Sequence, residues 1–415
     1  MDPTSTTTTR PRTPRLAEPC LDGEPVAAVL LADRPAPAEP GGEPGPEPGP
    51  GPRALRTVGV EEELLLVDPR SGRPVPAAEA VLRAAGQHPA GLPVLTAELQ
   101  QEQVETATPP RAELAALAGD LRDLRAVARA AAAAAGVLAV PVATSPLPVA
   151  PSLTPTARYR AIQERFGLTC AQQLTCGCHV HVAVTSPEEG VAVLDRIRPW
   201  LPVLAALSAN SPYAQGVDTG YAAYRAQAWG RWPTTGPADL YGSAAAYRAR
   251  LQQLLDTGVL LDAGMYYGDA RLSHRYPTVE VRVADVCLDP ADATLLAGLV
   301  RALVDTAARE WRAGVPAPQV STTVLRLAAW RASRDGAEGE LLHPLSGRPV
   351  GAGAAVAALL DHVARALADS GDTAGVEGRA EHVLARGTGA TWQRAVVGRT
   401  GDLGEVVRRA GAAAA

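Results

Sequence analysis

Three short stretches of the chain carry pairs of polar residues of catalytic type at i and i+2. If each stretch is a strand, both members of a pair point to one face and lie about 6.6 Å apart, from a rise of about 3.3 Å per residue. Carboxylates at that separation can reach one or two divalent cations. A solvated sheet face is the alternative for each pair alone, but three such faces together favour a site. The pairs are Glu61 and Glu63, His179 and His181, and Glu280 and Arg282.

The ligand types predict which cation such a site would take. Glutamates with one or two imidazoles, and no cysteine-rich cluster, favour Mg²⁺ or Mn²⁺ over a structural zinc. Cys178 would point away from His179 on a strand, so the thiols of Cys176 and Cys178 are expected to be small core residues. For His181, a structural role is favoured over a ligand role.

A further acidic segment, residues 98–105, is ambiguous in its secondary structure. As a helix it would place Glu98, Glu102 and Glu105 on one side. As a strand it would instead align Gln101, Gln103 and Glu105. From these residues alone, a solvated face and a functional site remain equally open.

Any anion must be bound without lysine, because all 39 of the Lys+Arg residues are arginine. This excludes mechanisms based on a Schiff base or on the phosphate-binding lysine of a P-loop. Arg225, Arg271 and Arg282 are the candidate phosphate contacts, since guanidinium groups bind oxyanions in bidentate fashion. Each alone could equally be a surface or ion-pair arginine, but Arg282 shares a strand face with Glu280.

The elements that must position these residues form a mixture of strands and long helices. Apolar residues alternate in the three stretches that carry the pairs, whereas Leu114, Leu117, Leu121 and Leu124 repeat at helical spacing. Ser186 with Pro187, and Asp289 with Pro290, are helix-start signals. The expected strands are 57–67, a short one ending at 143, 175–184 and 278–286, and the expected helices are 114–135, 187–209 and 290–312.

Length, charge and composition limit the remaining possibilities. The 415 residues carry a formal net charge of −5, which argues against a nucleic-acid or membrane surface. Five sparse cysteines indicate reduced thiols, and with no signal peptide recognised this predicts a cytoplasmic protein. Residues 1–56 are rich in Pro and Gly and are expected to be a disordered tail, followed by a single domain over 57–409.

Five short motifs follow one another along the chain in a characteristic order and spacing. They are Thr57-Val-Gly-Val-Glu-Glu-Glu63, Cys176-Gly-Cys-His-Val-His181, Ser208-Ala-Asn-Ser-Pro212, Asp218-Thr-Gly-Tyr-Ala-Ala-Tyr-Arg225 and Thr278-Val-Glu-Val-Arg-Val283. Weaker support comes from Gly387-Thr-Gly-Ala390 followed by Gln393-Arg394. Because of the order and spacing of these motifs, rather than any single one, residues 57–400 resemble the type 2 glutamate–cysteine ligase family of bacterial carboxylate–amine ligases.

The resemblance implies an α+β, glutamine synthetase-like fold, with a curved, mainly antiparallel sheet lining the site and helices outside. It implies that ATP phosphorylates a carboxylate, typically the γ-carboxyl of glutamate, and that an amine, typically that of cysteine, displaces phosphate. The partners are then small molecules, and a homodimer is left open. The implied metal ligands are Glu61, Glu63, Glu98, Glu105, His179 and Glu280, with Arg282 as phosphate contact.

One motif departs from the family pattern, and two other functions remain open. Where the family suggests Trp-Asp-x-Arg-Pro-Ser, this chain has Gly268 and Leu272 in place of Trp and Pro, which puts a substrate pocket in doubt. A non-catalytic nucleotide-binding relative is the first alternative. A metal-dependent amidohydrolase, suggested by His179 and His181, is the second, although such sites often contain a carboxylated lysine.

Overall fold

The computed structural model describes residues 55–86 and 95–413. The predicted tail, residues 1–56, lies outside this part except for Leu55 and Arg56. Arg56 belongs to the folded unit, because its guanidinium pairs with Glu189 at 2.7 Å and Asp305 at 3.3 Å. Within the described part, every helix is too short or too polar to span a lipid bilayer.

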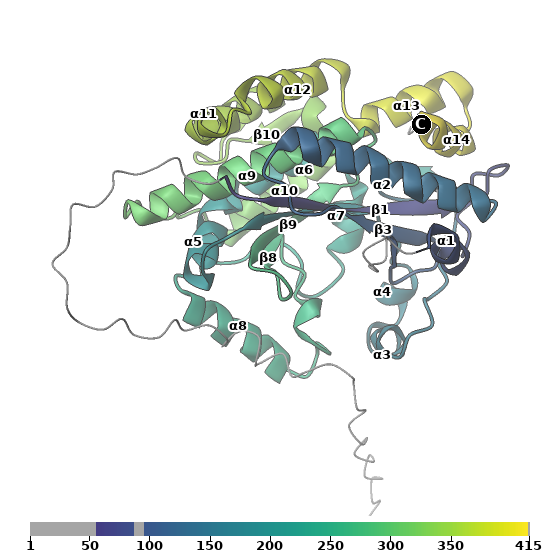
Figure 1. The fold of residues 1–415 in the computed structure, drawn as a ribbon, viewed down its shortest axis with the longest axis horizontal. Coiled ribbons are helices and arrows are strands. Elements are labelled where there is room, and N and C mark those ends of the chain that lie inside the picture. Colours follow the sequence, from purple (N-terminus) through teal and green to yellow (C-terminus); the bar gives the residue numbers. More distant parts are fainter. Residues whose placement is uncertain (1–54, 87–94, 414–415) are drawn as a thin grey trace, which may run out of the picture. The chain divides into compact units, whose positions relative to one another are not determined.

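The chain alternates between strands and helices along its length (Figure 1). The strands are β1 Val58–Val67, β2 Leu95–Ala97, β3 Gln103–Ala107, β4 Leu138–Val140, β5 Gly177–Ala183, β6 Tyr213–Ala214, β7 Val217–Asp218, β8 Ala270–Leu272, β9 Thr278–Asp285, β10 Glu340–Leu342 and β11 Pro349–Gly351. The helices are α1 Ala78–Ala85, α2 Leu114–Ala134, α3 Ala157–Phe166, α4 Leu168–Ala171, α5 Pro187–Ile197, α6 Leu201–Leu207, α7 Tyr224–Trp229, α8 Ala244–Asp256, α9 Pro290–Arg312, α10 Thr322–Asp335, α11 Ala352–Ser370, α12 Thr373–Arg386, α13 Gly389–Thr400 and α14 Leu403–Ala413.

A seven-stranded sheet forms the centre of the fold, with the strand order β2-β3-β1-β5-β9-β8 and β4 also paired to β1. All of its pairings are antiparallel. The long helices α2 and α9 cover one face, while α3, α4 and α8 lie on the other side of the sheet (Figure 1). The expected mixture of helices with a mainly antiparallel sheet is therefore confirmed.

A buried ion pair fixes β1 against the helix-covered face. Glu62 is 0% exposed and Arg125, from α2, is 2% exposed. The guanidinium donates to both carboxylate oxygens, at 2.8 and 2.6 Å, and also to the carbonyls of Cys287 and Leu288. Because side chains alternate along a strand, holding Glu62 on this face turns Glu61 and Glu63 to the opposite face.

Most of the expected elements are confirmed, and two expectations are corrected. The expected helix 187–209 is broken: α5 ends at Ile197, a 3₁₀ turn covers Arg198–Trp200, and α6 follows. Pro199 and Pro202 explain the break, since proline lacks the amide hydrogen that a continuous helix requires. Residues 98–105 are neither one helix nor one strand, because β3 begins only at Gln103 after a turn.

Candidate active site

The strand register brings the three predicted pairs together on one face of the sheet. Residues directly opposite each other on adjacent strands share a face, and the register pairs Glu61 with His179 and Glu63 with Glu105. Further along the sheet, Glu280 of β9 lies between its partners on β5 and β8. The residues opposite Glu280 are His181 and Arg271.

Seven carboxylate and imidazole groups on this face form three overlapping triads. Within each triad, the potential ligand atoms all lie within 4.8 Å of one another. Glu61 belongs to two triads, and so does Glu105, so the triads form a continuous row across the sheet. The triads are Glu61, His181 and Glu280; Glu61, Glu105 and His179; and Glu63, Glu98 and Glu105.

The turn before β3 explains how Glu98 joins this row while Glu102 does not. Glu105 faces the site from the strand, and Thr96 donates a 3.1 Å hydrogen bond to it. Glu98 reaches the same triad from the turn after β2. The carboxylate of Glu102 accepts the amide of Ser152 at 3.0 and 2.9 Å instead. Neither the helical nor the strand pattern of this segment predicts that Glu98 and Glu105 join the site while Glu102 does not.

The row is electrostatically polarised between its two ends. Burial alone would raise the pKa of Glu61 and of Glu280. Hydrogen bonds from His179 and His181 instead hold the pKa of Glu61 well below its ordinary value. At Glu280 the charges of Arg282 and Arg271 lower the pKa in the same way.

At the other end of the row, the pKa values of two carboxyl groups are raised. Burial and the charge of Glu63 raise the pKa of Glu98 to about 7. Burial and the charges of Glu98, Glu61 and Glu63 raise the pKa of Glu105 well above its ordinary value. Like charges in a buried cluster cannot all ionise without a counter-charge. This end is therefore the part of the site with the greatest demand for a cation.

The three predicted arginines all reach the site, but they are held in different ways. Arg271 donates to both oxygens of Glu280, at 2.7 and 3.2 Å, and to the carbonyls of Gly264 and Tyr266. All three of its guanidinium nitrogens thereby donate hydrogen bonds, which positions Arg271 against Glu280, and its contact with phosphate stays a prediction. Arg282 bonds the same carboxylate through Nη1 only.

Arg225 approaches the row through the close contact that Gly177 permits. An ideal Cβ placed on Gly177 would lie 2.3 Å from Nη2 of Arg225 and 3.0 Å from Nε2 of His179. The Gly177 amide also donates a 2.6 Å hydrogen bond to Glu63. Arg225 bonds the carbonyl of Arg282 at 3.3 to 3.4 Å. The absence of a side chain at Gly177, the glycine of the Cys-Gly-Cys-His motif, thus lets the guanidinium of Arg225 lie beside the row of triads.

Buried polar atoms without a hydrogen-bond partner concentrate around the histidines and arginines of the site. In the described part of the chain, seven buried side-chain nitrogen or oxygen atoms lack a hydrogen-bond partner, and four of them belong to the site. Buried polar groups are nearly always paired, so a cluster of exceptions indicates ligands that complete them. The four atoms are Nε2 of His179, Nε2 of His181, Nε of Arg225 and Nε of Arg282.

The structure settles where the histidines and cysteines lie. His181 is part of a triad, with Nε2 3.3 Å from an oxygen of Glu61, so the geometry allows a ligand role beside the structural role that the sequence favoured. Cys176 and Cys178 are free, buried and packed in apolar clusters. Their expected role as core residues is confirmed.

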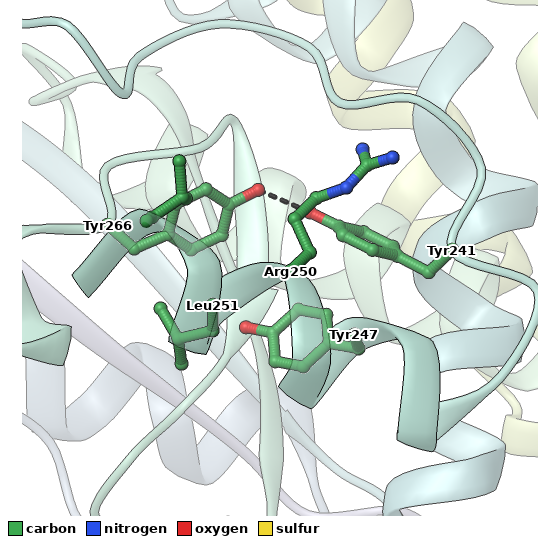
Figure 2. Close-up of a pocket in the computed structure, with 6 residues that line it drawn as sticks. Tyr241, Tyr247, Arg250, Leu251 and Tyr266 are labelled. Atoms are coloured by element: carbon green, nitrogen blue, oxygen red, sulfur yellow. Dashed lines mark hydrogen bonds between the residues drawn. The ribbon is translucent and has the colours of Figure 1, made fainter. Parts of the chain in front are cut away.

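The two departures from the family pattern have local packing reasons. A Cβ at Gly268 would lie 2.8 Å from the hydroxyl of Tyr266, which bonds the hydroxyl of Tyr241 in a small tyrosine-lined pocket (Figure 2). Leu272 packs on α5, where a Cβ at Gly190 would lie 2.6 Å from its side chain. Glycine at 268 therefore leaves room for the tyrosine pair.

Solved structures show which fold this is. A solved glutamate–cysteine ligase of Francisella tularensis, crystallised with AMP, matches with a TM-score of 0.65 at 14% identity, covering 87% of this chain and 88% of that one. A bifunctional glutathione synthetase of Pasteurella multocida gives 0.63 at 14% identity, over 86% of this chain and 52% of the other. The glutamine synthetase-like fold of these ligases is therefore the fold observed.

The sequence then gives the family. Residues 57–409 match glutamate–cysteine ligase family 2. A protein of Streptomyces avermitilis provisionally named glutamate–cysteine ligase 2-1 is 53% identical over 353 residues, 85% of this chain and 98% of the relative. A similarly named protein of Streptomyces coelicolor is 52% identical over 353 residues, 85% of this chain and 97% of the relative. The chain belongs to glutamate–cysteine ligase family 2, and the expected class, an ATP-dependent carboxylate–amine ligase, is confirmed.

Proposed function

We propose that this protein uses ATP and Mg²⁺ or Mn²⁺ to join the γ-carboxyl group of glutamate to the amine of cysteine or of another small molecule. The observation that carries the proposal is the row of three triads beside two buried arginines with unpaired Nε atoms. Carboxylate oxygens in this number suit hard divalent cations, and the guanidinium groups suit phosphate oxygens.

The residues present fit such cations. All seven of the ligand groups are buried or half-buried. Among residues 55–86 and 95–413, Nε2 of His179 has no hydrogen-bond partner, and Nε2 of His181 lies 3.3 Å from a carboxylate oxygen of Glu61. Bound cations would neutralise the charge of the β- and γ-phosphates of ATP. We assign Glu61, Glu63, Glu98, Glu105, His179, His181 and Glu280 as their ligands.

The chain's own cations would stabilise the phosphoryl group during its transfer. Arg282 offers the guanidinium edge that Glu280 leaves free, and Arg225 offers Nε from the adjacent position. Both arginines are buried or nearly so, where a fixed charge stabilises a developing charge more strongly than in water. Arg271 holds Glu280 from behind and thereby fixes the orientation of the carboxylate that Arg282 contacts.

The proposed reaction has two steps and forms no covalent bond between enzyme and substrate. A γ-carboxylate oxygen of glutamate attacks the γ-phosphorus of ATP, and ADP leaves with the electron pair of the broken P–O bond. The amine nitrogen then attacks the acyl carbon, the C–O bond to phosphate breaks, and the amine loses a proton as phosphate leaves. The chain has no lysine, and none of these steps requires one.

We place the reaction in the cytoplasm with small-molecule substrates. The support is the chemistry of the thiols: the four cysteines of the described residues are free and buried, as expected for a protein of a reducing compartment.

The proposal is tested by phosphate release from Mg-ATP and glutamate with a panel of amines, including cysteine, and a control without amine. The expected result is amine-dependent release, matched mole for mole by ADP and a γ-glutamyl amide identified by mass spectrometry. Release without any amine dependence, or no release despite nucleotide binding, would contradict it. The second outcome would support the non-catalytic alternative.

A further inference from the structure

Two motifs of the sequence have no role in the site described above, yet they meet each other beside it. Asn210 and Ser211 lie in the first motif, and Gln393 lies on α13 near the end of the chain. These three residues and Asp285, the last residue of β9, are each 1% exposed. A buried polar cluster of this kind is stable only when its members pair with one another.

The contacts lead from the sheet to Arg225. One oxygen of Asp285 accepts both the amide of Asn210, at 2.9 Å, and the hydroxyl of Ser211, at 2.6 Å. The same Ser211 hydroxyl oxygen accepts the backbone amide of Arg225 at 2.9 Å. Burial raises the pKa of Asp285 to about 6, and the two hydrogen bonds that this oxygen accepts oppose that rise.

The contacts also lead from this cluster to α13. The side-chain amide of Gln393 donates to the carbonyl and to the side-chain oxygen of Asn210, at 2.9 and 2.8 Å. Asn210 in turn donates to the carbonyls of Pro141 and Val286, at 2.8 Å each. A Cβ at Gly389 would lie 2.2 Å from the Asn210 side chain, which explains the glycine at the start of α13.

We propose that Gln393, Asn210, Asp285 and Ser211 form a positioning network that fixes Arg225 against Gly177, so that α13 is a functional part of the active site. The inference rests on the proposed role of Arg225 in phosphate binding. The four residues do not contact the substrate themselves. They fix the backbone of Arg225, and this places its guanidinium between Gly177 and the carbonyl of Arg282.

The first test compares Ser211→Ala with Ser208→Ala as a matched control. Ser208 is also buried, and its hydroxyl oxygen accepts the backbone amide of Asp285 at 3.2 Å. Its hydroxyl group, unlike that of Ser211, does not accept the backbone amide of Arg225. Both variants lose one buried hydroxyl and are expected to lose similar thermal stability. Only Ser211→Ala is expected to lower kcat/KM for Mg-ATP, by about tenfold, because only it frees Arg225.

A double-mutant cycle separates positioning from general damage. If Ser211 acts through Arg225, then adding Ser211→Ala to Arg225→Ala lowers kcat/KM no further. Gln393→Ala keeps the Ser211 hydroxyl and tests the far end of the network, including the case in which Ser211→Ala does not fold. It is expected to lower kcat/KM in the same direction and to show the same lack of additivity.

The outcomes distinguish this inference from the proposed function. Wild-type turnover combined with additive effects of Ser211→Ala and Arg225→Ala, or equal kinetic loss in Ser208→Ala and Ser211→Ala, would overturn the positioning network alone. Wild-type protein that neither binds Mg-ATP in calorimetry nor releases phosphate with any amine would overturn both. Binding measured by calorimetry for the same variants serves as the readout if turnover with the amines tested is slow.

Discussion

Replacing Gly177 by alanine is the smallest change that should disable the site. The added methyl group would lie 2.3 Å from Nη2 of Arg225 and 2.9 Å from its Cζ, closer than any non-bonded carbon contact allows. The guanidinium is the part that must move, because Gly177 itself is fixed by β-sheet pairing and by the hydrogen bond from its amide to Glu63.

The expected loss of turnover follows from the overlap between the added methyl group and the guanidinium of Arg225. To restore an ordinary contact, Arg225 must retreat by about 1 Å, and misplacement of that size in a reacting geometry costs about 100-fold in rate. The packing strain is expected to cost about 1 to 3 kcal/mol of folding free energy. A 100-fold loss of rate corresponds to about 2.7 kcal/mol of activation free energy, so the two costs are similar in size, and the loss of turnover is measured on the fraction of the variant that remains folded.

The assay is initial-rate phosphate release with Mg-ATP, glutamate and the best amine, together with thermal unfolding. Gly59→Ala is the matched control: Gly59 lies opposite His181 on the same sheet face, but a Cβ there meets nothing nearer than 3.7 Å. Turnover close to wild type is expected for Gly59→Ala. If Gly177→Ala keeps kcat/KM within twofold of wild type while folded, the position of Arg225 against this glycine does not matter for the reaction.

Three further predictions follow from the same structure. Glu280→Gln should lower stability by about 3 to 5 kcal/mol as well as abolish turnover, because it leaves Arg271 and Arg282 buried without their shared counter-charge; an unchanged urea midpoint would contradict this. In metal-free protein, Glu98 binds its proton more tightly in the folded state, where its pKa is about 7, than in the unfolded state, where it is about 4.5. The free energy of unfolding should therefore fall by up to about 3 kcal/mol as pH rises from about 4.5 to about 7. Mg²⁺ should restore that loss, increasingly with pH, and thermal unfolding at pH 5 and pH 8 with and without Mg²⁺ checks both statements. Deletion of residues 1–52 should leave melting temperature and turnover unchanged, since their composition predicts no buried core; a large change in either would move the domain boundary.

Sequence reasoning predicted the parts of the site that depend on local geometry. Glu61 and Glu63 share a face because side chains alternate along any strand, whatever its neighbours are. The same rule joined Glu280 to Arg282. The family resemblance then added Glu98, which the ambiguous segment could not place without knowledge of the turn before β3.

The remaining features depend on strand register and on tertiary packing, which a single sequence does not specify. That Glu280 holds two arginines follows from the alignment of β8 with β9. That Gly177 faces Arg225 follows from packing between segments about fifty residues apart. The contact between His181 and Glu61 could not be predicted for the same reason, because the two residues lie on different strands.

The sharing of Glu61 and Glu105 between neighbouring triads has a consequence for the order of binding. If all three triads held divalent cations, their five carboxylates would meet six positive charges, with the guanidinium groups of Arg225 and Arg282 close by. Such a site would carry excess positive charge until a nucleotide triphosphate arrived. We therefore expect the free protein to hold fewer cations than the nucleotide complex, with the last cation entering together with ATP, so that metal titrations with and without nucleotide give different stoichiometries.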